Sequence, residues 1–90
     1  MRIAGYTAQF KRDYKKATAR GKDMSAIERA MFLLTMEEQL PDSYKDHQLK
    51  GRWKTYRELH IGPDWLLVYY LVDDKVVFHR TGTHSDIFNE

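Results

Sequence analysis

The residues of this 90-residue chain that are best suited to acid and base chemistry are its four histidines, at positions 47, 60, 79 and 84. Near neutral pH one imidazole can accept the proton of a ribose 2′-hydroxyl while another, protonated, donates to the leaving 5′-oxygen. Asp64 follows His60 by four residues and can orient its ring or pair with its charged form. His79 lies inside an alternating stretch and is assigned to the surface. The pattern permits metal-free RNA cleavage by His47, His60 and His84 together with Asp64.

Cations close to these histidines are candidates for stabilising charge on a phosphate, and they are Lys50, Arg57 and Arg80. Three histidines and an aspartate also permit a divalent-metal site. However, no short paired-ligand spacing such as H-x-x-x-H occurs, and the chain has no cysteine. We therefore expect no metal and no cofactor.

The aromatic residues divide into core and surface candidates. Trp53 and Trp65 are typical of core or sheet-face positions rather than of platforms on which bases stack. Phe88 follows the last predicted strand in a polar tail, so it is either exposed for stacking on a base or docked back on the core.

Basic residues gather at the start of the chain, although the formal net charge is only +2. Residues 1–22 contain seven Lys or Arg against one acidic residue, Asp13. Such a cluster can bind a polyanion, but a solvated helix face has the same composition, and charge alone favours the solvated face. The cations in question are Lys11, Arg12, Lys15, Lys16 and Arg20.

Two helices are predicted before residue 41. Apolar residues at helical spacing indicate an amphipathic helix over 8–20, preceded by an edge strand over 2–6. A second helix begins at Asp23 or Ser25, where Ser25 and Glu28 match a capping box, and it ends before Pro41. Because only two or three residues join the helices, we expect an antiparallel hairpin.

Three strands are predicted in the second half of the chain, over 53–60, 65–72 and 75–81, because these stretches are rich in aromatic and β-branched residues. The connections are too short for crossovers, so the strands form an antiparallel meander. The apolar stretch 65–72 should be its central strand. The predicted fold is thus α+β, in the order β-α-α-β-β-β with a short C-terminal tail, as a single domain over 1–90. This topology brings His60, Asp64 and His84 to one edge of the sheet.

The motifs that carry a family resemblance run through nearly the whole chain. The stretch YKDHQLKGRWKTYRELHIGPDWLLVYYL, from Tyr44 to Leu71, and the ending RTGTHSDIF, from Arg80 to Phe88, resemble the YafQ branch of RelE-type bacterial toxins. F-K-R-D-Y-K-K, from Phe10 to Lys16, is similar to the first helix of that family. The ordered set D-H-x-L, G-x-W, P-D-W and R-T-G-T-H is specific, whereas each motif alone would be weak.

The resemblance implies a RelE-like microbial RNase fold and cleavage of mRNA in the ribosomal A site. By position, His47, His60, Asp64 and His84 match the catalytic residues of the family. In that assignment His84 is the general acid, His47 is the general base, and His60 and Asp64 stabilise the transition state. The resemblance also gives Trp65 and Phe88 supporting and substrate-contacting roles. The cations of the first helix acquire a role in contacting ribosomal RNA.

The partners that the resemblance implies are mRNA, the 70S ribosome and a cognate antitoxin of the DinJ-like, ribbon-helix-helix type. The complex of toxin and antitoxin would bind operator DNA. A non-catalytic module that acts with its antitoxin on operator DNA is the alternative. We expect a cytoplasmic protein without a membrane partner, because no long apolar run and no secretory signal are seen.

Overall fold

The computed structural model describes residues 1–89 and contains a five-stranded sheet in the order β1-β5-β4-β3-β2. The strands are β1 (Ile3–Tyr6), β2 (His47–Gln48), β3 (Arg57–Gly62), β4 (Trp65–Val72) and β5 (Lys75–Gly82). The helices are α1 (Ala8–Ala19), α2 (Met24–Thr35) and α3 (His84–Phe88), with 3-10 turns η1 (Asp42–Tyr44) and η2 (Gly51–Trp53). Strand β1 pairs in parallel with β5, and the other pairs are antiparallel. The predicted α+β fold and the edge position of the first strand are confirmed.

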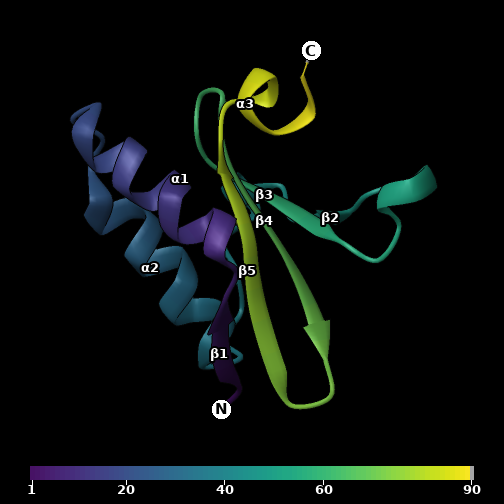
Figure 1. The fold of residues 1–90 in the computed structure, drawn as a ribbon. Helices are drawn as coiled ribbons and strands as arrows, with labels where there is room; N and C mark the ends of the chain where they lie inside the picture. The colour runs from purple at the N-terminus through teal and green to yellow at the C-terminus, as the bar shows by residue number, and fades with distance from the viewer. Residues whose placement is uncertain (90) are drawn as a thin grey trace.

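The two long helices lie side by side on one face of the sheet (Figure 1). Helix α1 begins where the Thr7 side chain accepts a hydrogen bond from the Phe10 amide. Helix α2 is capped by Asp23, whose carboxylate accepts from the Ser25 amide at 3.1 Å. The predicted capping box on Ser25 is therefore wrong, because the Ser25 hydroxyl donates to Asp23 instead. Within residues 1–89 no helix is both long and apolar enough to cross a membrane.

Strand β4 occupies the middle of the sheet and is buried on both faces, as its apolar sequence predicts. Its residues Trp65, Leu67 and Tyr69 belong to the core under the helices. Leu66 and Val68 face the other side, where they pack with Ile87 of α3. The core is thus larger on the helix side, and the opposite face is left for the site described below.

Two segments differ from the prediction. The strand expected over 53–60 begins only at Arg57, because η2 occupies Gly51–Trp53 and the chain between β2 and β3 forms a loop. Figure 1 shows this loop projecting away from the sheet on the side opposite the helices. The expected C-terminal tail contains α3, which begins at a capping box between Thr83 and Asp86 and is anchored by Ile87.

Two irregularities in strand register interrupt the regular alternation of side chains. Ile61 is an extra residue between the pairs His60–Leu66 and Gly62–Trp65. His79 is an extra residue of β5 between the pairs that Phe78 and Arg80 make with β4. Bulges of this kind increase strand twist and re-aim neighbouring side chains. Both lie on the strand segments that lead toward the end of the sheet where the histidines gather.

His79 is not the surface residue that the sequence predicts. Its ring lies 4.5 Å from that of Tyr56, centroid to centroid, and its buried Nδ1 has no hydrogen-bond partner among residues 1–89. Burial, and secondarily the charge of Arg80, lower the pKa of His79 below its ordinary value. The folded protein therefore favours the neutral ring.

This burial predicts a pH-dependent loss of stability on the acid side. Below the ordinary histidine pKa of about 6.5, the unfolded chain binds a proton at His79 more readily than the folded chain does, so stability falls as the pH falls. The variant His79→Phe keeps the aromatic contact with Tyr56 and removes the titrating group. Urea unfolding at about pH 8 and about pH 5.5 should show a smaller acid loss for His79→Phe than for wild type. Equal losses in both proteins would contradict the assignment.

Candidate active site

Three histidines from separate segments line one end of the sheet. The ring of His60, in β3, lies 6.2 Å from the ring of His47 and 6.3 Å from that of His84, centroid to centroid. His47 comes from β2 and His84 begins α3. The convergence expected for His60 and His84 is confirmed, and His47 joins them because β2 pairs with β3.

Glu58 lies between two of these rings and was missed by the sequence analysis. Its Oε2 is 3.3 Å from Nε2 of His47 and 3.8 Å from Nε2 of His60, and the residue is only 5% exposed. Glu58 and His60 are two residues apart on one strand, so they share a face, and Glu58 stands opposite His47 in the strand register. The sequence signal for this contact is the spacing E-x-H in β3, which is also typical of the polar face of an ordinary strand.

The hydrogen bonds of His47 determine where its ring carries protons. Nδ1 lies 2.7 Å from the carbonyl oxygen of Lys45, which can only accept, so Nδ1 carries a proton. Nε2 faces the Glu58 carboxylate. The ring of His47 is thus held between the Lys45 carbonyl and the buried Glu58 carboxylate.

Asp64 holds His84 from the turn between β3 and β4. Its Oδ1 accepts from the backbone amide of His84 at 3.1 Å and from its ring Nδ1 at 3.0 Å. These bonds, the backbone one first, lower the pKa of Asp64. The carboxylate thus favours a proton on Nδ1 and leaves Nε2 of His84 as the nitrogen available for chemistry.

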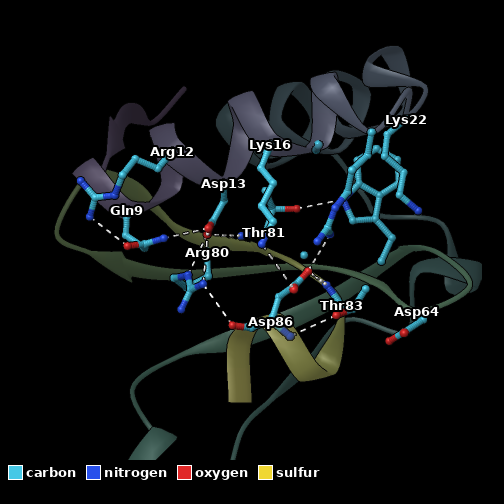
Figure 2. Close-up of a pocket in the computed structure, with 14 residues that line it drawn as sticks. Gln9, Arg12, Asp13, Lys16, Lys22, Asp64, Arg80, Thr81, Thr83 and Asp86 are labelled. Carbon is cyan, nitrogen blue, oxygen red and sulfur yellow. Dashed lines mark hydrogen bonds and ion pairs between the residues drawn. The ribbon is translucent and has the colours of Figure 1, made fainter. Parts of the chain in front are cut away.

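The strand end that carries His84 is fixed from the helix side of the sheet. The buried carboxylate of Asp13, in α1, accepts from Arg80 Nε at 2.7 Å and from the Thr81 amide at 3.1 Å (Figure 2). The Thr81 hydroxyl accepts from the indole nitrogen of Trp65 at 3.0 Å and donates to the Leu66 carbonyl at 2.8 Å. This network determines where β5 ends and therefore where His84 begins.

The next residues of the R-T-G-T-H motif form the cap of α3. Asp86 accepts from the Thr83 amide at 3.0 Å, and Arg20 of α1 binds the same carboxylate at 2.9 Å. These contacts, Arg20 first, lower the pKa of Asp86 to about 2. At Gly82 a side chain is excluded, because an added Cβ would lie 3.0 Å from Cβ of Asp86.

Two of the predicted phosphate-binding cations, Arg57 and Arg80, are bound to carboxylates of the chain itself. Arg80 is bound to Asp13 of α1, as described above, and also donates to the Asp86 carbonyl of α3 at 3.3 Å. Arg57 Nη2 donates to Asp46 at 2.8 Å, and Tyr69 donates its hydroxyl to the other oxygen of the same carboxylate at 2.5 Å. Arg57 and Tyr69 face the helices, since they alternate with Glu58 and Val68. The structure does not bring Arg57 to the histidines.

The other predicted substrate contacts, Lys50, Trp65 and Phe88, lie in three different environments. Lys50 is exposed in the loop between β2 and β3. Trp65 is 6% exposed and belongs to the core. Phe88 is half-buried, with its ring 5.2 Å from that of Trp53 and 6.2 Å from that of His84. It is therefore docked on Trp53 and still partly accessible.

The cations of α1 are all exposed but lie on two sides of the helix. Arg12, Lys16 and Arg20 line a cavity of about 130 Å³ between α1 and the end of β5 (Figure 2). Lys11 and Lys15 border a separate groove between α1 and α2. Lys16 and Arg20 also pair with Asp86, so part of this charge holds α3 in place.

The atoms that could bind a metal ion are those of His47, Glu58 and His60. One ligand atom from each lies within 4.8 Å of the others. Two imidazoles and a carboxylate suit zinc or copper. The expectation of no metal site rested on the absence of ligands spaced along one helix. This cluster instead combines Glu58 and His60 of β3 with His47 of the neighbouring strand β2.

The relatives of the chain are bacterial toxins. The family described as "Bacterial toxin of type II toxin-antitoxin system, YafQ" matches residues 2–89. The chain belongs to the YafQ toxin family. It is 46% identical over 84 residues to the mRNA interferase toxin YafQ of Escherichia coli K12, covering 92% of this chain and 91% of that protein. The resemblance drawn from the motifs is thereby confirmed.

Solved structures of YafQ-type toxins share the fold over almost their full length. A crystal structure of YafQ from Escherichia coli BL21(DE3) is 44% identical with a TM-score of 0.92, covering 98% of this chain and 99% of that one. YafQ in a DinJ-YafQ complex from the same species is 45% identical with a TM-score of 0.89, over 98% and 99%. A copper-bound mutant toxin from Helicobacter pylori is 38% identical with a TM-score of 0.93, over 98% and 100%.

The contact between Tyr69 and Asp46 predicts an effect on His47, the residue next to Asp46. Tyr69→Phe removes one donor from the carboxylate, so the turn that presents the Lys45 carbonyl to His47 should loosen. We expect a loss of about 1 kcal/mol in the free energy of unfolding and a change in the ring nitrogen shifts of His47, measured by NMR with ¹⁵N-labelled histidine.

Tyr70→Phe is the matched control, because Tyr70 faces the opposite side of β4, where its ring packs on Tyr56. It should leave the nitrogen shifts of His47 unchanged. If both variants alter His47 equally, the Asp46 contact has no specific part in placing it.

Proposed function

We propose that the chain is an endoribonuclease toxin that cleaves mRNA in the A site of translating ribosomes by acid and base catalysis. The observation that carries the proposal is the row of three imidazoles, at 6.2 and 6.3 Å spacing, with Glu58 between His47 and His60 and Asp64 on His84. Such a row can serve both oxygens of a single phosphodiester. Membership of a toxin family that includes an mRNA interferase supports the same chemistry.

His84 acts as the general acid in this proposal. Its Nδ1 is engaged by Asp64, which leaves Nε2 to donate a proton to the departing 5′-oxygen. Asp64 stabilises the charged ring before transfer and fixes its orientation. A positioned acid of this kind contributes about 10² to 10⁴ in rate.

His47 acts as the general base, together with Glu58. The 2′-hydroxyl loses its proton to this pair and attacks phosphorus, the bond to the 5′-oxygen breaks, and the products are a 2′,3′-cyclic phosphate and a 5′-hydroxyl. His60 lies against the same Glu58 carboxylate as His47, so the two rings and the acid form one compact cluster. The positive charge that the cluster acquires stabilises the phosphorane, with Lys50 as a further cation.

The proposed partners follow from the surfaces and the relatives. The exposed cations of α1 are suited to ribosomal RNA, since local Lys and Arg supply the affinity for phosphates. YafQ from Escherichia coli forms a complex with DinJ, and we propose a cognate antitoxin of that type here, which with the toxin binds operator DNA. Translating ribosomes as the target place the protein in the cytoplasm.

Primer extension on a defined message tests the activity. Wild type should produce cuts only when ribosomes translate the message, and the fragments should carry a terminal phosphate at the 3′ side. His84→Gln should lower the cleavage rate by about 10² or more, because the acid is lost. His79→Phe is the control outside the imidazole row and should cut as wild type does. Undiminished cleavage by His84→Gln would exclude the acid role.

Metal addition tests the role of the cluster around Glu58. Zinc or copper bound by His47, Glu58 and His60 would occupy the atoms that the base needs, so added metal should inhibit cleavage and excess EDTA should preserve it. Glu58→Gln weakens the ligand set and should reduce inhibition of the residual activity. Loss of wild-type cleavage in EDTA, restored by zinc, would instead favour a metal-dependent nuclease.

A further inference from the structure

Arg20 differs from the other exposed cations of α1, because its charge is already used inside the protein. Its Nη1 lies 2.9 Å from Oδ2 of Asp86, in α3. Lys16 approaches the other oxygen of that carboxylate only to 3.8 Å, and its side chain is more exposed, at 57% against 43% for Arg20. The remaining cations of α1 make no ion pair within residues 1–89, and they are Lys11, Arg12 and Lys15.

Asp86 carries this contact to the residue that precedes His84. The oxygen that Arg20 binds also accepts from the Thr83 amide at 3.0 Å, and the Thr83 hydroxyl accepts from the Asp86 amide at 3.0 Å (Figure 2). His84 follows Thr83 directly and is the first residue of α3. Arg20 is therefore two contacts away from the backbone that presents the imidazole.

Helix α3 needs such contacts because it has only five residues. Helices of this length are not stable alone. Ile87 anchors α3 in the apolar cluster with Leu66 and Val68, which holds the helix against the sheet. The cap formed by Thr83 and Asp86 holds the end that carries His84, and Arg20 ties this cap to α1.

The charge of Asp86 also acts on the carboxylate that orients His84. Hydrogen bonds from His84, the backbone one first, lower the pKa of Asp64, whereas burial and the charge of Asp86 oppose this lowering. The Arg20 guanidinium is the largest of the influences that lower the pKa of Asp86 itself, to about 2. Without Arg20, an uncompensated carboxylate would stand near the contact between Asp64 and His84.

We propose that Arg20 is a positioning residue for His84, which through Asp86 holds the start of α3 where the imidazole can reach the departing 5′-oxygen. The proposal rests on the proposed ribonuclease function, in which His84 is the general acid. Arg20 then contributes to the rate of cleavage rather than to the affinity for ribosomal RNA. The basic face of α1 thus has two roles, because its unpaired cations remain available to phosphates.

Cleavage of a defined message at varied ribosome concentration tests the assignment. Arg20→Gln should lower turnover at saturating ribosomes about tenfold, since a reacting group misplaced by about 1 Å loses about 10² in rate and α3 keeps its anchor at Ile87. The ribosome concentration at half-maximal rate should not change. An increase in that concentration with normal turnover would show that Arg20 binds RNA, and the proposal would be wrong.

Arg29→Gln is the matched control for the loss of one charge. Arg29 is an exposed arginine of α2 whose side chain has no hydrogen bond or ion pair within residues 1–89. This variant should cut as wild type does. A tenfold loss of turnover in Arg29→Gln would attribute the effect of Arg20→Gln to net charge and overturn the proposal.

A double variant tests whether Arg20 acts through Asp86. Asp86→Asn keeps an oxygen for the Thr83 amide and removes the charge that Arg20 compensates. In this background, Arg20→Gln should change turnover by less than about twofold, because coupled residues lose their effect when the partner is removed. A tenfold loss in both backgrounds would mean that Arg20 acts by another route.

Histidine ring shifts separate this proposal from the ribonuclease function. In protein labelled with ¹⁵N-histidine, Arg20→Gln should change the ring nitrogen shifts of His84 by NMR. It should leave those of His47 unchanged, since that ring is held by Lys45 and Glu58. Unchanged shifts of His84 in a protein that cuts mRNA would refute the role of Arg20 and retain the ribonuclease function. Changed shifts of His84 in a protein that never cuts mRNA would refute the ribonuclease function and retain the placement of His84 by Arg20.

Discussion

The buried carboxylate of Asp13 is the contact on which the end of the sheet that carries the three imidazoles depends. It accepts from the Arg80 side chain and the Thr81 amide, and so ties the first helix to the last strand near the point where that strand ends. The chain then turns at Gly82 and begins α3 with His84. Removing one partner of a buried pair leaves an uncompensated charge, which costs about 3–5 kcal/mol. The position of His84 is therefore determined by contacts that the last strand makes with the first helix.

A second carboxylate acts in the same way at the other end of the imidazole row. Asp46 is held by Arg57 and Tyr69 on the helix side, and the next residue is His47. Burial and the contact with Asp46 raise the pKa of Tyr69, so its hydroxyl remains a donor. In both cases an arginine that is close to a histidine in sequence binds a carboxylate, and this ion pair holds the backbone next to the imidazole row in place.

The sequence analysis succeeded where the determinants are local and failed where they are tertiary. Helical spacing and short connections define the order of elements, and a turn of two residues is enough to bring Asp64 toward His84. Helix α3 was missed because five residues show no periodicity, and its formation depends on Ile87 reaching Leu66 and Val68. Glu58 was missed because its role appears only when β2 pairs with β3. The carboxylate partners of Arg57 and Arg80 could not be predicted because they lie on elements distant in sequence or in a neighbouring loop.

Because side chains alternate along a strand, the register that packs the core also determines which residues face the site. Leu59 is fully buried opposite Leu67, under the helices. A slip of one residue in β3 would expose Leu59 and drive Glu58 into the apolar core, at a cost of several kcal/mol from hydrophobic exposure and charge burial together. The register that buries Leu59 is the one that places Glu58 opposite His47 and turns His60 toward His84. The apolar residues under the helices thus select the arrangement of charged groups on the other face.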